Sequence, residues 1–354
     1  MPLGGFGGWG DAPVPTTGNG VGVALINLIL PLHYEKKRGG VNWLKVLKNQ
    51  ELREIYGEKK VKITDMGNIK EIMYLEKCNK QPFGIKKISK DEYIVLATGE
   101  IQEYKNKSEN RSQDKESLRK TFKNIRQLIN TNFVGNKNEL CFTITYKENI
   151  RDPKILYKDF DKFMKKLKYR YGSIDYINVV EPQGRGAWHC HILLRFNDLK
   201  KAYIPNRDIA EMWGHGFVKV KAMKKDIDNL GAYLSAYLGD IEINDSNISD
   251  LIADGSIKPG QAINIKEVDV DGVKKKFIKG GRLHYYPSGM NIYRCSRGIK
   301  KPTVSHMTYS EAKKIVGADT PTYSSCTLIQ DDNENIINTI VYEQYNLKRI
   351  KNQR

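Results

Sequence analysis

The chain has 354 residues, and its 59 Lys and Arg against 41 Asp and Glu give a formal net charge of +18. Such an excess favours polyanionic partners, with nucleic acid as the first candidate. The five cysteines are odd in number and show no C-x-x-C spacing, which excludes a disulfide framework or zinc ribbon and predicts a reducing, cytoplasmic location. The longest apolar run, residues 21–32, is too short to span a bilayer, so no membrane partner is expected.

Residues 1–65 and 66–130 form two expected N-terminal regions. The first begins with a Gly- and Pro-rich stretch, and we expect it to be disordered or poorly structured. The second contains an expected hairpin over residues 92–104 and a basic amphipathic helix over residues 115–133. We interpret residues 66–130 as an accessory region rather than as the centre of the fold.

Residues 131–245 show the most regular order of elements and form the expected core. In chain order we predict a strand (139–149), a helix beginning at Asp152 and Pro153, a hairpin (175–196), a helix (206–213), a strand (216–223) and a helix (225–239). This order predicts an α+β fold, with an antiparallel or mixed sheet of about five strands and helices packed against it. Residues 246–354 form a C-terminal extension with a capped helix at 308–317 and a hairpin over 325–345.

Residues 179–196, VVEPQGRGAWHCHILLRF, place two of the six histidines one residue apart in an expected strand. Alternate residues of a strand share a face, so His189 and His191 project together. If the hairpin is centred on Arg185, Glu181 lies opposite His189 on that same face. Two imidazoles and one carboxylate would suit Mg²⁺, Mn²⁺ or Zn²⁺, although a polar strand face without a metal remains the alternative.

The expected helix at 225–239 carries Tyr233 and Tyr237, four residues apart on one flank. Amphipathic packing is the simpler explanation for this pair, because the chain has 20 tyrosines. Together with a metal held by the strand pair, however, a tyrosine on a neighbouring helix could attack a phosphodiester and form a covalent phosphotyrosine. The basic surface would then hold a single strand of nucleic acid.

Four segments resemble the HUH endonucleases, and more narrowly the rolling-circle replication initiators of bacterial plasmids and phages, a group that includes the filamentous-phage replication protein. The segments are CFTITY (141–146), EPQGRGAWHCHILL (181–194), GAYLSAYLGD (231–240) and YRCSRGIKKP (293–302). The second resembles the metal-binding motif of these enzymes, and the third resembles their tyrosine motif. The resemblance covers the chain from about residue 91 onward and does not extend over the first 65 or so residues.

The resemblance implies a role for each matching residue. His189, His191 and, by spacing, Glu181 would hold Mg²⁺ or Mn²⁺. Tyr233 would nick single-stranded DNA at a replication origin and leave a 5′-phosphotyrosine, and Tyr237 would transfer the strand at termination.

One position departs from the family pattern. Relatives commonly read Y-x-x-K in the tyrosine motif, and Ala236 stands here in place of that lysine. Lys224 or Lys225, at the start of the same helix, could substitute for it, and we expect both to contact DNA together with Arg185.

The partners and the rival functions follow from the same residues. The chain has no G-x-x-x-x-G-K-[ST] motif, so a host helicase would unwind the duplex and a host polymerase would extend the free 3′ end. A relaxase or transposase with the same chemistry is one alternative. A non-catalytic origin-binding protein is another, although it would not need Glu181, His189, His191 and Tyr233 together.

Overall fold

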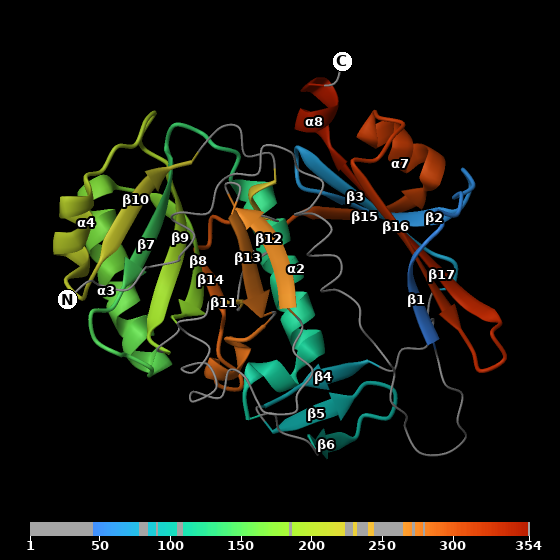
Figure 1. The fold of residues 1–354 in the computed structure, drawn as a ribbon, viewed down its shortest axis with the longest axis horizontal. Helices are drawn as coiled ribbons and strands as arrows, with labels where there is room; N and C mark the ends of the chain where they lie inside the picture. Colours follow the sequence, from blue (N-terminus) through green and yellow to red (C-terminus); the bar gives the residue numbers. More distant parts are fainter. Residues whose placement is uncertain are drawn as a thin grey trace.

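The computed structural model describes residues 45–77, 84–89, 91–104, 109–183, 186–223, 229–231, 240–243, 265–270, 273–278 and 280–352. The fold is α+β, as the sequence predicts, and its strands form four sheets in which every pair of neighbours is antiparallel. Two of these sheets are large, and helix α2 (Lys115–Asn132) stands between them (Figure 1). No helix within the described ranges is long and apolar enough to cross a membrane.

The five-stranded sheet corresponds to the expected core. Its order is β10-β7-β9-β8-β14, with β7 at Glu139–Thr145, β8 at Ile174–Pro182, β9 at Trp188–Phe196, β10 at Val218–Ala222 and β14 at Tyr293–Cys295. Helices α3 (Pro153–Tyr171) and α4 (Asn206–Trp213) complete the predicted order of elements up to residue 223. Only residues 229–231 of the expected helix at 225–239 are described.

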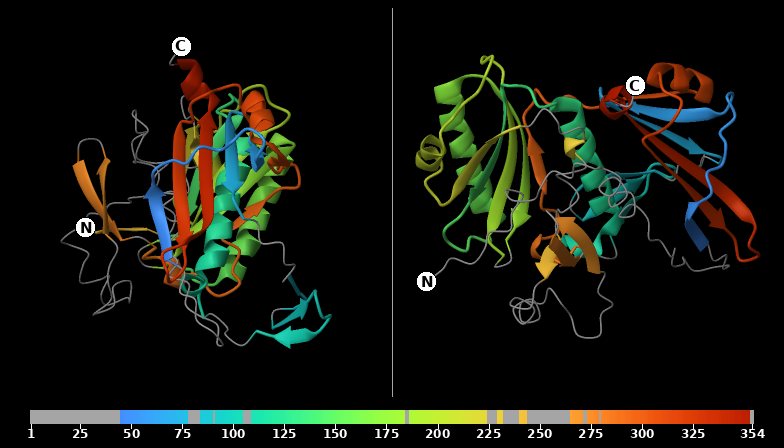
Figure 2. Two further views of the ribbon diagram at one scale, coloured as in Figure 1. Left: turned by 90° about the vertical axis from the view of Figure 1, so that its right-hand side faces the viewer. Right: turned by 45° about the horizontal axis from the view of Figure 1, so that its top comes forward.

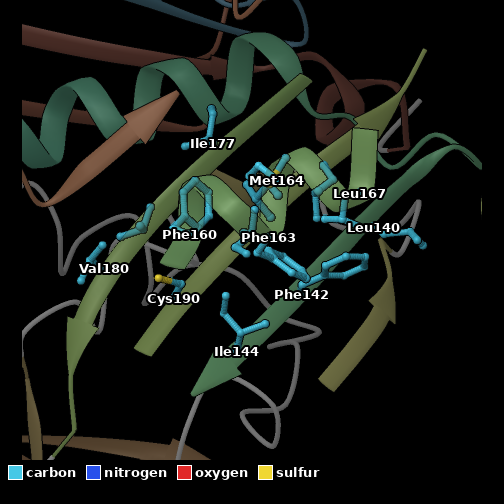
Figure 3. Packing of buried hydrophobic residues seen from close by; sticks show 14 of the residues in the cluster. Leu140, Phe142, Ile144, Phe160, Phe163, Met164, Leu167, Ile177, Val180 and Cys190 are labelled. Carbon is cyan, nitrogen blue, oxygen red and sulfur yellow. The ribbon is translucent and has the colours of Figure 1, made fainter. Parts of the chain in front are cut away.

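The strand alternation assigns each residue of this sheet to one of two faces. Phe142, Ile144 and Cys190 point toward α3, where they meet Phe160 and Phe163 in the buried core (Figure 3). The alternate residues of the same strands, including His189 and His191, therefore point to the opposite face, on the side of α2 (Figures 1 and 2).

The six-stranded sheet joins the first and last parts of the described chain. Its order is β1-β16-β17-β3-β2-β15, with β1 at Lys45–Gln50, β2 at Lys60–Asp65, β3 at Ile69–Leu75, β15 at Thr303–Thr308, β16 at Tyr323–Gln330 and β17 at Ile336–Asn346. Helix α7 (Tyr309–Val316) covers one face and α8 (Leu347–Asn352) follows β17 (Figure 2).

Residues 45–65 differ from the expectation of poor structure, because they form β1 and β2. Both strands pair with segments close to the other end of the chain, β16 and β15, and a local pattern carries no information about such partners. Residues 1–44 lie outside the described ranges. The domain boundaries that the sequence suggests stay a prediction.

Two small sheets and two short turns of 3-10 helix complete the structure. One sheet contains β4 (Ile85–Lys87), β5 (Glu92–Val95) and β6 (Ile101–Glu103); the other contains β11 (Ile241–Ile243), β12 (Ile265–Val270) and β13 (Val273–Ile278). The 3-10 turns are η1 (Arg111–Gln113) and η2 (Leu283–Tyr285). The predicted hairpin at 92–104 is confirmed by β5 and β6, and the predicted capping box by Thr308 and Glu311 of α7.

Candidate metal centre

The hairpin of β8 and β9 brings three potential metal ligands together on the α2 side of the five-stranded sheet. Glu181 pairs directly with His189, as the symmetric hairpin predicts, and His191 follows on the same face. The Nε2 atoms of His189 and His191 lie 3.1 and 3.2 Å from Oε2 of Glu181, and 3.0 Å from each other. All three side chains are buried, with exposed fractions of 6% or less. They form the one group of this kind found within the described part of the chain.

The donor set fits a divalent cation. Ligand atoms about 2.1 Å from a shared metal, at octahedral or tetrahedral angles, lie about 3.0 to 3.4 Å apart. The three separations of 3.0, 3.1 and 3.2 Å in the cluster match this spacing. Two imidazole nitrogens and one carboxylate oxygen that converge on one point can therefore hold a metal ion.

The electrostatics of the cluster keep its ligands in the states that metals require. Burial alone would raise the pKa of the Glu181 carboxyl, but the charge of Arg282 and hydrogen bonds with His189 and His191 hold that pKa well below its usual range. Burial lowers the pKa of His191 to about 4, against a smaller opposing effect of Glu181. The carboxylate is thus ionised and His191 neutral near pH 7, which is the form that binds a cation.

Sequence reasoning missed Arg282, which completes the surroundings of Glu181. Its Nη1 atom donates to Oε1 of Glu181 at 2.9 Å, so the other carboxylate oxygen faces the histidines. Tyr286 fixes this loop, because its hydroxyl donates to the carbonyl of Val180 at 2.8 Å. No local signal marks Arg282, which lies 101 residues from its partner.

The other predicted site residues belong to the hairpin loop and to the expected tyrosine helix. Tyr233, Tyr237, Lys224, Lys225 and Arg185 all lie outside the described residues, as does Ala236. Trp188, next to His189, is buried and donates from Nε1 to the carbonyl of Arg151 at 2.8 Å, so it packs in the protein interior.

Both ends of the segment that carries the two tyrosines are anchored by described residues. At its start, the side chain of Asn130 on α2 binds the backbone N–H of Gly231 at 2.7 Å and the side chain of Asn229 at 3.0 Å. At its end, Asp240 accepts a hydrogen bond from the backbone N–H of Gly280 at 2.8 Å. Gly280 lies two residues before Arg282, so the segment ends beside the loop that contacts Glu181.

An α+β fold with a buried His, His and Glu cluster defines a candidate metal-binding protein. Residues 139–242 of this chain match the model of a protein family described as replication-associated protein ORF2/G2P. The matched region contains the cluster of Glu181, His189 and His191 and the segment with Tyr233 and Tyr237, but not Arg282 or the six-stranded sheet. No curated protein and no solved structure matches the chain. The family match supports a replication initiator family and a role on DNA.

Replacement of Arg282 by glutamine is expected to lower the affinity for Mn²⁺ by about tenfold or more, since residues that orient a metal ligand contribute on this scale. Without the guanidinium of Arg282, Glu181 loses its partner at Oε1 and is free to turn away from the histidines. Isothermal titration calorimetry with Mn²⁺ measures the change. Arg170→Gln, which breaks an exposed ion pair with Asp208 on another face, removes the same charge and is the matched control. A rise in affinity would instead mean that repulsion between Arg282 and the metal outweighs orientation.

Proposed function

We propose that the chain is a rolling-circle replication initiator of the HUH type, which nicks and rejoins single-stranded DNA at an origin with a tyrosine and with Mg²⁺ or Mn²⁺. The observation that carries the proposal is the buried cluster of Glu181, His189 and His191, since it lies inside the region that matches a replication-associated family. A simple polar strand face would not require three donors aimed at one point in the protein interior.

The chemistry assigned to the residues is a transesterification at phosphorus. A divalent cation at the cluster, when bound, would polarise a non-bridging phosphate oxygen. Tyr233 loses its phenolic proton and attacks phosphorus, the bond from phosphorus to O3′ breaks, and O3′ takes up a proton. The products are a 5′-phosphotyrosine and a free 3′-OH, so the energy of the phosphodiester bond is kept for rejoining. Tyr237 performs the second attack when the replicated strand is released.

The anchoring of the tyrosine segment supports this arrangement. Gly231, two residues before Tyr233, is hydrogen-bonded to Asn130. Asp240, three residues after Tyr237, is hydrogen-bonded to Gly280 in the loop of Arg282. Arg282 in turn contacts Glu181. The described residues on each side of the tyrosines are therefore tied to α2 and to the neighbourhood of the cluster, which supports the proposal that a tyrosine attacks a phosphate bound there.

The proposed partners follow from the reaction. The protein acts on single-stranded origin DNA, and a host polymerase extends the free 3′-OH while a host helicase opens the duplex. We also assign DNA contacts to three basic residues. In the sequence, Arg185 lies just before the strand that carries His189 and His191, and Lys224 and Lys225 lie before the tyrosine segment. A relaxase or transposase would use the same residues for transfer of a strand to another site.

The test is a denaturing-gel assay in the presence of Mn²⁺. Its substrate is single-stranded DNA from the replication origin of the genetic element that encodes the protein, labelled at the 3′ end. The intact protein is expected to form a protease-sensitive adduct on the 5′ end of the cleaved product. His191→Ala should remove the adduct, and at least one of Tyr233→Phe and Tyr237→Phe should do the same. Tyr169→Phe, at a tyrosine that is 95% exposed on α3, is the matched control. Tight DNA binding without any adduct would contradict the nuclease and favour a non-catalytic origin-binding protein.

A further inference from the structure

The six-stranded sheet has an inner face that is turned toward α2. Ile63 and Ile72 lie on the other face and pack under α7 in the second hydrophobic core. Glu71, adjacent to Ile72, must point the opposite way, and its carboxylate receives hydrogen bonds or ion pairs from Gln127 and Arg126 of α2. Figures 1 and 2 show the same order, with α2 on one side of the sheet and α7 on the other.

The strand register identifies the side chains of this inner face. One cross-strand row contains His306, Lys62, Met73, Tyr342 and Ser325, and the next contains Val304, Thr64, Glu71, Gln344 and Tyr323. None of these residues belongs to either hydrophobic core cluster of the described chain. The inner face is therefore largely polar. Thr64, Glu71 and Gln344 are buried on it, whereas Lys62 and Tyr323 are half-buried and remain partly accessible.

Positive charge gathers on the inner face of the sheet and on the side of α2 that faces it. Helix α2 carries Arg119, Lys123 and Arg126 at positions i, i+4 and i+7, which lie along one side of a helix. Glu71 is the one carboxylate of the two rows, and it pairs with Arg126. The half-buried Lys62 and Lys123 form no ion pair with the described residues.

The cations are close enough to repel one another. Burial and the charge of Lys62 lower the pKa of Lys123 against the opposing effect of Glu71, and burial and the charge of Arg119 lower the pKa of Lys48 on β1. Unpaired ammonium groups that lose water are costly unless an anion approaches them. The surface is thus electrostatically complementary to a polyanion.

We propose that this inner face, together with the facing side of α2, is a binding surface for single-stranded DNA. Lys48, Lys62 and Lys123 contact phosphates, and Tyr323 offers its ring for base stacking. Tyr323 and Tyr342 lie 6.2 Å apart between ring centroids and are both half-buried, so an aromatic pair accompanies the cations. Cations combined with aromatic rings are typical of surfaces that follow a single strand.

The position of α2 connects this surface to the proposed site of nicking. A Cβ atom on Gly231 would lie 2.3 Å from the carbonyl oxygen of Arg126, so the start of the tyrosine segment packs directly on α2. The side chain of Arg126 reaches from the same turn to Glu71 on the inner face. A strand that leaves the nick site can therefore continue past α2 onto the sheet. The location next to the nick site depends on the proposed function, whereas DNA binding by the surface does not.

The first experiment measures binding of the full chain to a fluorescently labelled single strand of about 30 nucleotides by anisotropy, at several salt concentrations. The double variant Lys62→Glu and Lys123→Glu should weaken binding by about tenfold or more relative to Lys158→Glu with Lys162→Glu, which makes the same charge change on exposed residues of α3. Lys62→Gln with Lys123→Gln should make the slope of log affinity against log salt shallower by about 1.4, since each lost phosphate contact contributes about 0.7. Equal loss in the α3 control would overturn the proposal.

Two further measurements distinguish the effect of charge on DNA binding from the effects of base stacking and of folding. Tyr323→Ala should weaken binding to the single strand by about tenfold, and Tyr169→Ala should not. The glutamine variants should keep the thermal unfolding temperature of the parent chain, so a loss of binding with intact unfolding supports the surface. A loss confined to duplex DNA would contradict the single-strand assignment. The adduct assay on the parent chain reports nicking and the anisotropy assay reports binding by this surface, so failure of the surface and failure of the nuclease give different results.

Discussion

Replacement of His191 by alanine is expected to lower the affinity of the chain for Mn²⁺ by more than about 100-fold. Loss of a residue that only orients a metal ligand costs about 10- to 100-fold, and loss of the ligand itself should exceed that range. His191 is the most deeply buried of the three donors, at 1% exposure, and its Nε2 atom lies within 3.2 Å of both other donor atoms. No described neighbour can take its place, because the cluster is the one potential metal group of the described chain.

Calorimetric titration with Mn²⁺ at pH 7 measures this effect, and His306→Ala is its control, since His306 is exposed on β15 in the other large sheet. Glu181→Gln should also weaken binding strongly, because it keeps the shape of the side chain but removes its negative charge. Unchanged affinity in both His191→Ala and Glu181→Gln would mean that the cluster is a hydrogen-bonded group and not a metal centre. The function proposed above would then lose the observation that carries it.

The sequence predicts the grouping of Glu181, His189 and His191 because every relation it depends on is local. Side chains of a strand alternate between two faces, and a hairpin with a short loop pairs residues symmetrically about its centre. These two rules place Glu181 opposite His189, and the structure confirms that pair. Another local signal, Asp152 followed by Pro153, correctly predicts the start of α3.

The sequence does not predict contacts between segments that are distant along the chain. Arg282 reaches Glu181 across 101 residues, and no period or motif in its own segment indicates the partner. Strand β1 pairs with β16, which is also distant along the chain, and no local signal indicates this pairing. Residues 45–65 were therefore expected to be poorly structured. The amphipathic pattern of α2 indicates its buried stripe, but not that its polar side would face a second sheet.

The buried pair of Arg126 and Glu71 supplies the second large expected effect. Glu71→Gln or Arg126→Met alone should destabilise the chain by about 3–5 kcal/mol, because each leaves a buried charge without its partner. Both side chains are nearly inaccessible, with exposed fractions of 4% and 3%. The double variant Glu71→Met with Arg126→Met should be less destabilised than either single variant, since neither charge then remains buried. Urea denaturation measures the free energies, and Arg170→Met at the exposed pair with Asp208 is the control.

The pH dependence of these variants distinguishes an ion pair from a packing effect. In the folded parent chain the pKa of Glu71 is lowered, since Arg126 and hydrogen bonds from Arg126, Gln127 and Tyr342 outweigh the opposing effect of burial. A lowered folded pKa contributes stability above the unfolded value of about 4.3, and this contribution is lost as the pH falls through the folded pKa. The difference in unfolding free energy between parent and Glu71→Gln should therefore shrink as the pH falls below about 4. In Arg126→Met, burial without the cation raises the pKa of Glu71. The loss of unfolding free energy in this variant, relative to the parent chain, should therefore begin to shrink at a higher pH than in Glu71→Gln. A deficit that is constant from pH 7 to pH 3 would assign the loss to packing between α2 and the sheet, and not to the charges.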